Sequence, residues 1–185
     1  MKKYLIFTLL VAMLSVNAYS QEQQQEKSQS KTVEFLSRYG SFYKKEFFNL
    51  QTIGKSIDRI EFQVLIITDM KTNSKMGCLR LEKYFGDDSY IGTLDQDELD
   101  ACIQCIEKIQ ADIINNNPDT YTEVEYKTRD GVSIGAFWSN ESKWEIYIQT
   151  KKYSSRSMTF VNAESIPKII DNLKKAKEMI VEKTK

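Results

Sequence analysis

The chain has 185 residues and none of them is histidine. Histidine is the usual general base near neutral pH and the commonest metal ligand, so its absence excludes His-dependent nucleophile sites and zinc sites built on imidazole. Acid–base chemistry would then depend on carboxylates, and the sequence places no two acidic residues in a convincing catalytic pair. We therefore predict a protein that is not an enzyme, with no catalytic residue, metal site or cofactor.

Cys102 and Cys105 form a C-x-x-C sequence, the spacing used by disulfide oxidoreductases. In those proteins the first cysteine lies at a helix N-terminus, where the helix dipole lowers its pKa. Here the predicted helix begins near Asp95, so Cys102 lies two turns inside it and on its apolar stripe. We interpret both cysteines as packing residues. Cys78 lies in a predicted strand with its side chain on the face opposite Leu79, which disfavours a bridge to the helix.

Two further patterns suggest chemistry but have simpler interpretations. Ser165 and Lys168 match S-x-x-K, the nucleophile motif of penicillin-binding enzymes, yet the companion K-T-G is missing and the segment resembles a helix start. A group of acidic residues could bind calcium, but it lacks the glycine and the final glutamate of an EF-hand loop. Acidic residues in the first turn of a helix are favoured by its dipole. This group comprises Asp87, Asp88, Asp95, Asp97, Glu98 and Asp100.

A polar and aromatic sheet face is the better candidate for binding. If Leu79, Leu81, Ile146 and Ile148 face the helices, strand alternation sends their neighbours to the opposite face. Such a face can bind by stacking and hydrogen bonds, or it can simply be solvated. We predict Tyr147 as its anchor, because tyrosine buries a large area and keeps a hydroxyl group. The candidate binding residues are Tyr147, Arg80, Tyr84, Glu145 and Gln149, with Glu82 beside them.

The elements that would position these residues start with a helix over 94–114. Asp95 suits the N-cap, and Glu98 follows at the spacing of a capping box. Apolar residues recur at three- and four-residue intervals along it, which predicts one buried stripe. A second helix is predicted over 163–182, starting at Asn162 or at Ser165; only the latter places Pro167 in the first turn, where proline is tolerated.

Strand-like runs fill most of the remaining sequence. The run Val64 to Ile67 has four successive apolar residues, which indicates either a strand covered on both faces or a bulge. Asp130-Gly131 predicts a hairpin turn. A short helical turn is expected over 32–39, and strands are expected over 42–53, 57–70, 77–85, 89–94, 120–128, 132–138, 143–151 and 156–161. The fold class is therefore α+β, an antiparallel sheet or sheets with two helices.

A shift of 67 residues brings the two helices and their preceding strands into register. It places Leu79 on Ile146 and Asp95 on Asn162, and it carries the apolar stripe of the first helix onto that of the second. We interpret this match as an internal ββββα pseudo-repeat, with halves at about 42–114 and 120–182. The order of elements resembles the paired ββββα units of the PUR and Whirly families, over roughly 42–182. That resemblance implies single-stranded nucleic-acid binding, but no shared motif assigns a residue to it.

The first 20 residues have the pattern of a secretory signal peptide, with Lys2 and Lys3 before an apolar run and small residues at Ala18 and Ser20. Residues 21–31 contain no apolar side chain and predict a flexible leader, so a single domain is expected over 32–185. The chain resembles small exported bacterial proteins of unknown function. We expect a periplasmic or secreted protein with no membrane span in its mature form.

Charge bears on the partner. The chain has 26 basic and 26 acidic residues, and removal of two lysines with the signal peptide leaves 24 basic residues and a charge of −2. This balance disfavours a nucleic-acid partner, which would favour a basic surface. The leading hypothesis is a non-catalytic binding module for an unknown protein or small ligand. The alternatives are a PUR/Whirly-type nucleic-acid binder and an enzyme that uses carboxylates.

Overall fold

The computed structural model describes residues 29–56, 58–139 and 143–185. The predicted signal peptide and residues 21–28 of the predicted leader lie outside these ranges. Residues 29–31 of the predicted leader do fall within the described ranges, where Ser30 caps a short helix whose first residue is Lys31.

Two antiparallel sheets and two long helices make up the fold, so the predicted α+β class is confirmed. Sheet A has the strand order β1-β3-β4-β5, and the short β2 also pairs with β3. Sheet B is a meander with the order β6-β7-β8-β9. The strands are β1 (Tyr43–Asn49), β2 (Ile53–Lys55), β3 (Asp58–Asp69), β4 (Lys75–Phe85), β5 (Asp88–Asp95), β6 (Thr122–Lys127), β7 (Ser133–Trp138), β8 (Trp144–Gln149) and β9 (Met158–Val161).

Each sheet is followed by one long helix, and a 3₁₀ turn precedes each of them. Glu98 accepts a hydrogen bond from the backbone N–H of Asp95 at 2.9 Å, so the predicted capping box forms. At the second helix Asn162 begins the 3₁₀ turn and Ser165 precedes the α-helix, which leaves Pro167 in the first turn. The helices are α2 (Lys31–Leu36), α3 (Leu99–Lys108) and α4 (Ile166–Lys183), and the π-helix η2 (Ile109–Ile113) continues α3. The 3₁₀ turns are η1 (Gln96–Glu98), η3 (Ser155–Ser157) and η4 (Ala163–Ser165).

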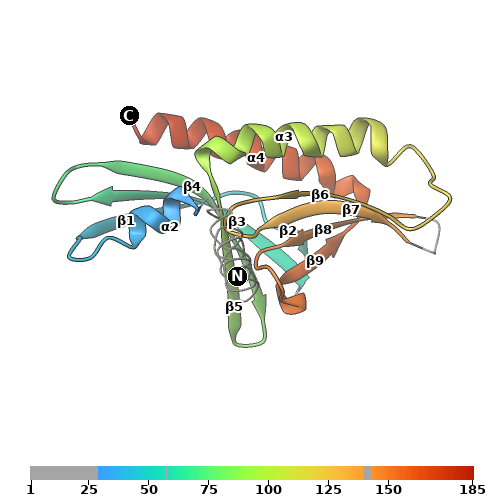
Figure 1. Ribbon diagram of the computed structural model, residues 1–185, viewed down its shortest axis with the longest axis horizontal. Coiled ribbons are helices and arrows are strands. Elements are labelled where there is room, and N and C mark those ends of the chain that lie inside the picture. The colour runs from blue at the N-terminus through green and yellow to red at the C-terminus, as the bar shows by residue number, and fades with distance from the viewer. Residues whose placement is uncertain (1–28, 57, 140–142) are drawn as a thin grey trace, which may run out of the picture.

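The two helices lie side by side along one side of the molecule, above both sheets (Figure 1). Each helix packs on the sheet that it does not follow in the chain. α3 follows sheet A but packs on β6 of sheet B, and α4 follows sheet B but packs on β3 and β4 of sheet A. One hydrophobic core therefore joins both sheets and both helices. We call the sheet faces turned toward this core inner and the opposite faces outer. No helix in the described part of the chain is long and apolar enough to cross a bilayer.

The apolar run in β3 is covered on both faces, which resolves the alternatives left by the sequence. Val64 and Ile66 point into the shared core. Leu65 and Ile67 point to the outer face, where they form a second cluster with Phe35 of α2. Pairing with β1 and β4 continues through all four residues without a break, so no bulge is present.

The two sheets approach closely where β5 meets the ends of β7 and β8. Gly92 of β5 makes this approach possible, because a Cβ atom there would overlap the carbonyl oxygen of Thr150 and the side chain of Val132. Only glycine allows so close a backbone approach. The consequence is that the turns of sheet B lie against the free edge of sheet A.

Candidate functional site

The outer face of sheet A is partly closed by α2. Asp95, at the end of β5, is 1% exposed and its carboxylate accepts hydrogen bonds from the start of that helix. The backbone N–H groups of Lys31 and Thr32 donate to it at 2.7 and 3.0 Å, and the hydroxyl groups of Ser30 and Thr32 donate at 3.0 and 2.6 Å. One buried carboxylate therefore fixes the N-terminus of α2 on the sheet.

Arg129, in the turn between β6 and β7, joins the same network from sheet B. Its guanidinium lies 2.9 Å from Asp95, 2.5 Å from Asp97 and 3.5 Å from Glu98, and its backbone N–H donates to Glu98 at 2.8 Å. Three carboxylates of the predicted acidic group thus converge on one arginine. The three carboxylates are therefore engaged in ion pairs with Arg129, and none of them is free to act as a general base.

The pKa values agree with this structural role. Burial alone would raise the pKa of Asp95, but the hydrogen bonds from Thr32, Lys31 and Ser30 outweigh it and lower the pKa. The Arg129 guanidinium, helped by Lys31, holds the pKa of Asp97 far below its usual range. Both carboxylates therefore stay charged near neutral pH. A carboxylate that acts as a general base would instead have a raised pKa, nearer the working pH.

The predicted binding residue Arg80 lies on the outer face of sheet A and is already paired. Its guanidinium donates to Glu82 at 2.7 Å, and this contact lowers the pKa of Glu82. It also donates to Gln63, and it lies 5.7 Å from the centre of the Phe47 ring. Tyr84, farther along β4, has 43% of its surface exposed. The Arg80 guanidinium thus already donates to two side chains and has few N–H donors left for a ligand.

No helix among the described residues packs over the outer face of sheet B. The strand register places Tyr147 of β8 between Gly135 of β7 and Phe160 of β9. The Phe137 ring lies 6.3 Å from Tyr147, 6.3 Å from Tyr121 and 5.9 Å from Phe160, measured between ring centres. Such distances are those of favourable aromatic pairs, so these rings form one continuous aromatic layer.

Tyr147 is the buried member of that layer. It lies on the outer face but is only 3% exposed, since neighbouring side chains cover its ring. Its hydroxyl lies 2.7 Å from a carboxylate oxygen of Glu123 and 3.2 Å from one of Glu125. Burial, together with the hydrogen bond to Glu123, raises the pKa of Tyr147 well above its usual range. Tyr147 thus lies beneath the exposed rings and packs against Phe137, where solvent does not reach it.

The side chains that reach solvent are Tyr121 and Phe160, which are 58% and 50% exposed. The other two predicted residues flank them. Glu145 pairs with Lys143 at 3.1 Å, and the Gln149 side chain donates to the backbone carbonyl of Ser154 at 3.1 Å.

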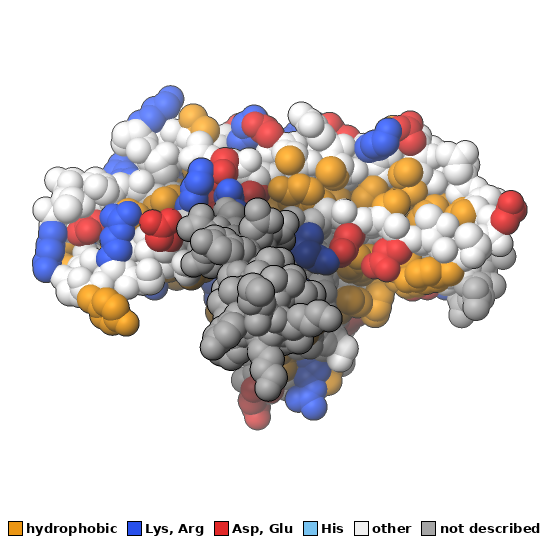
Figure 2. Space-filling view, viewed as in Figure 1, with side chains coloured by type: hydrophobic (Ala, Val, Ile, Leu, Met, Phe, Trp, Pro, Cys, Tyr) orange, Lys and Arg blue, Asp and Glu red, His pale blue; other side chains and the backbone are white. Residues whose placement is uncertain are grey.

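Figure 2 shows hydrophobic side chains along α3 and over the strands of sheet B.

The five predicted binding residues therefore divide between two faces. Tyr147, Glu145 and Gln149 lie together on sheet B, while Arg80 and Tyr84 lie on sheet A. The rest of the face was not predicted from the sequence: the rings of Tyr121, Phe137 and Phe160, and the carboxylates of Glu123 and Glu125 beside them. Alternation along β6, β7 and β9 could have suggested these residues, but only the pairing register shows that they lie beside Tyr147.

The three cysteines are free thiols and occupy different environments. Cys102 lies in the shared core and Cys78 in the cluster under α2, on opposite sides of sheet A. Burial raises the pKa of Cys78 to about 12, so its thiol stays protonated. Cys102 is therefore a packing residue as predicted, but Cys105 is exposed on α3, so that interpretation is wrong for Cys105.

Comparison of the chain with protein-family models, with curated proteins and with solved structures finds no match. A proposal for function therefore depends on the geometry alone.

Proposed function

We propose that the protein is an exported, non-catalytic binding module and that its ligand docks on the outer face of sheet B. The observation that carries this proposal is the aromatic layer, in which Phe160 and Tyr121 stay half exposed over the buried Tyr147. Exposed aromatic side chains on a rigid sheet are the usual anchors of a binding surface. A strand framework also holds them in fixed positions before the ligand arrives.

The chemistry of the face indicates the class of ligand. Its side chains include the carboxylates of Glu123, Glu125 and Glu145, of which two pair with Lys127 and Lys143. An excess of one negative charge remains beside the rings. The best-matched ligand is a peptide segment that carries an apolar or aromatic side chain next to a basic one.

The same charges weigh against the two alternatives. Nucleic-acid phosphates would be repelled by carboxylates beside the rings, although the rings themselves could stack on bases. An enzyme that uses carboxylates would need one of them to be free with a raised pKa. Glu125 instead has a lowered pKa, because Lys127 donates a hydrogen bond to it.

Export is part of the proposal and is supported by the pattern of residues 1–20. Mass spectrometry of the protein from its host should find an N-terminus near Gln21. A cytoplasmic chain that retains Met1 would contradict export, while leaving the binding face untouched.

Selection from a phage-displayed random peptide library tests the binding face. We expect the peptides bound by the wild-type protein to be rich in aromatic and basic residues. Their addition should shift backbone amide NMR signals of β6–β9. Acidic peptides, or shifts confined to sheet A, would contradict the proposal. A single-stranded oligonucleotide that binds with strong salt dependence would favour the nucleic-acid alternative.

A further inference from the structure

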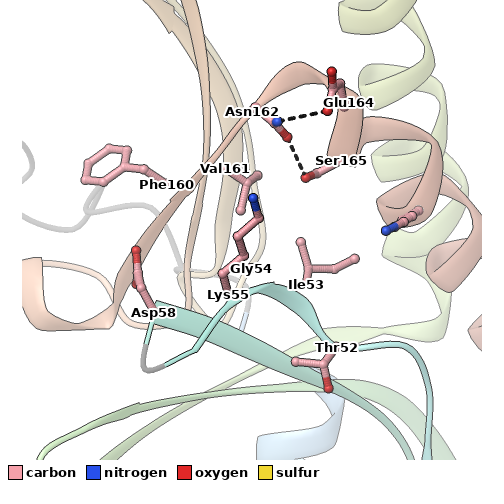
Figure 3. Close-up of a pocket in the computed structure, with 11 residues that line it drawn as sticks. Thr52, Ile53, Gly54, Lys55, Asp58, Phe160, Val161, Asn162, Glu164 and Ser165 are labelled. Atoms are coloured by element: carbon pink, nitrogen blue, oxygen red, sulfur yellow. Dashed lines mark hydrogen bonds between the residues drawn. The ribbon is translucent and has the colours of Figure 1, made fainter.

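A pocket of about 400 Å³ opens between the two halves, on a different part of the molecule from the aromatic layer. One wall is the β2–β3 hairpin of sheet A, and the other is the junction of β9 with α4 (Figure 3). Its volume is near the lower end of the range for small-molecule sites. Lining residues from both halves therefore enclose one space.

The acidic residues of this pocket are already engaged. Asp58 accepts a hydrogen bond from Thr159 at 3.0 Å and forms an ion pair with the buried Lys83. Glu164 accepts a hydrogen bond from the Asn162 side chain at 3.1 Å. Asn162 in turn accepts one from the Ser165 hydroxyl at 3.0 Å. These bonds fix the polar wall of the pocket.

The basic residues of the pocket have no such partners. Lys55 of β2 and Lys168 of α4 both line it, and within the described ranges neither ammonium has an ion pair or hydrogen bond. Figure 3 shows Lys55 extending from β2 toward the β9–α4 junction. Lys83 offsets the charge of Asp58, whereas Glu164 keeps its negative charge. The two ammonium groups therefore leave the pocket with an excess of one positive charge for an anionic ligand.

The hairpin that presents Lys55 has a special backbone. Gly54 has a φ of +99°, and a Cβ atom there would overlap the backbone carbonyl of Asp58. Only glycine adopts this conformation without strain. Gly54 therefore lets β2 lie close against β3, where Lys55 pairs with Asp58 in the strand register and lines the pocket.

We propose that this pocket binds a small dianion, of the phosphate or dicarboxylate class, between Lys55 and Lys168. Ammonium groups pair with phosphate or carboxylate oxygens through charge-assisted hydrogen bonds. Because one lysine comes from sheet A and the other from α4, the bound ligand would bridge the two halves of the molecule. This site is separate from the sheet B face, and its test does not depend on that face.

Titration with inorganic phosphate and, separately, with succinate tests the proposal, with backbone amide NMR as the readout and sodium chloride at matched ionic strength as the blank. We expect at least one probe to saturate at millimolar concentration and to shift the signals of β2 and of η4. The probe that saturates identifies the class. If neither saturates, or if chloride gives the same shifts, the proposal is overturned.

Lys55→Gln and Lys168→Gln should each weaken the binding of the saturating probe by about five- to tenfold, because solvent around these exposed side chains reduces a charge-assisted bond to the size of an ordinary net hydrogen bond. Both side chains are exposed, so folding should be retained. Lys45→Gln, an exposed lysine of β1 outside this pocket, is the matched control and should leave the affinity unchanged. An unchanged affinity in the double variant, or an equal loss in the control, would overturn the assignment.

Discussion

The outer faces of the two sheets differ in what covers them. On sheet A, α2 lies over Leu65, Ile67 and Cys78, and the buried Asp95 holds its first residues. On sheet B the corresponding layer consists of aromatic rings, and two of them stay half exposed. Both faces belong to sheets with four main strands followed by a helix. The difference is that a helix covers one outer face, whereas the other keeps exposed rings, and this is why we propose the ligand site on sheet B.

The 67-residue shift makes this comparison specific. It carries η1 onto η4 and the first residue of α3, Leu99, onto the first residue of α4, Ile166. The same shift pairs the buried Asp95 with the exposed Asn162. An internal repeat stays a prediction, tested by superposing residues 73–114 on 140–181, with 140–142 outside the described ranges.

Removal of the Asp95 side chain should have the largest effect. Asp95→Ala leaves Arg129 and the start of α2 without their shared acceptor, and we expect a loss of about 3–5 kcal/mol in the free energy of unfolding. Asn162→Ala, its counterpart on the other half, should change that free energy by less than about 1 kcal/mol. Urea denaturation measures both, and equal losses would break the comparison.

Truncation of the shared core should come next. Ile106 of α3 is 2% exposed, so Ile106→Ala should cost about 2–5 kcal/mol through lost burial and a residual cavity. Val181→Ala, a partly exposed position on α4, is the control and should cost far less. An unfolding midpoint that is unchanged in Ile106→Ala would show that the stripe of α3 does not hold the sheets together.

Acid should weaken the attachment of α2 to sheet A. The pKa values of Asp95 and Asp97 are lowered in the fold, so their stabilising effect is complete above the ordinary aspartate pKa of about 3.9 and is lost as the pH falls below it. We expect the urea midpoint to drop between about pH 5 and about pH 2. The drop should be smaller in Asp95→Asn, and an equal drop would assign the acid sensitivity to other carboxylates.

Much of the fold could be predicted from the sequence, because its signals are local. The capping box at Asp95, the apolar stripe of α3 and the Asp130-Gly131 turn each depend on residues that are near in sequence. The packing of α3 on sheet B and of α4 on sheet A could not be predicted from such local signals. Similarly, alternation along β8 places Tyr147 on an outer face, but it does not predict that side chains from β7 and β9 bury its ring. Strand register decides which rings surround Tyr147, whereas tertiary packing decides which sheet each helix covers.

One matched pair of phenylalanines tests the central claim most directly. Phe160 on sheet B and Phe47 on sheet A are 50% and 51% exposed, so each truncation to alanine removes a similar exposed ring. The measurement is the Kd of a peptide selected on the wild-type protein, determined by calorimetry for each variant. We predict that Phe160→Ala weakens binding by more than about 1 kcal/mol, roughly fivefold or more, and that Phe47→Ala leaves the Kd unchanged. An unchanged Kd in Phe160→Ala, or a loss confined to Phe47→Ala, would contradict the assignment of the ligand to sheet B.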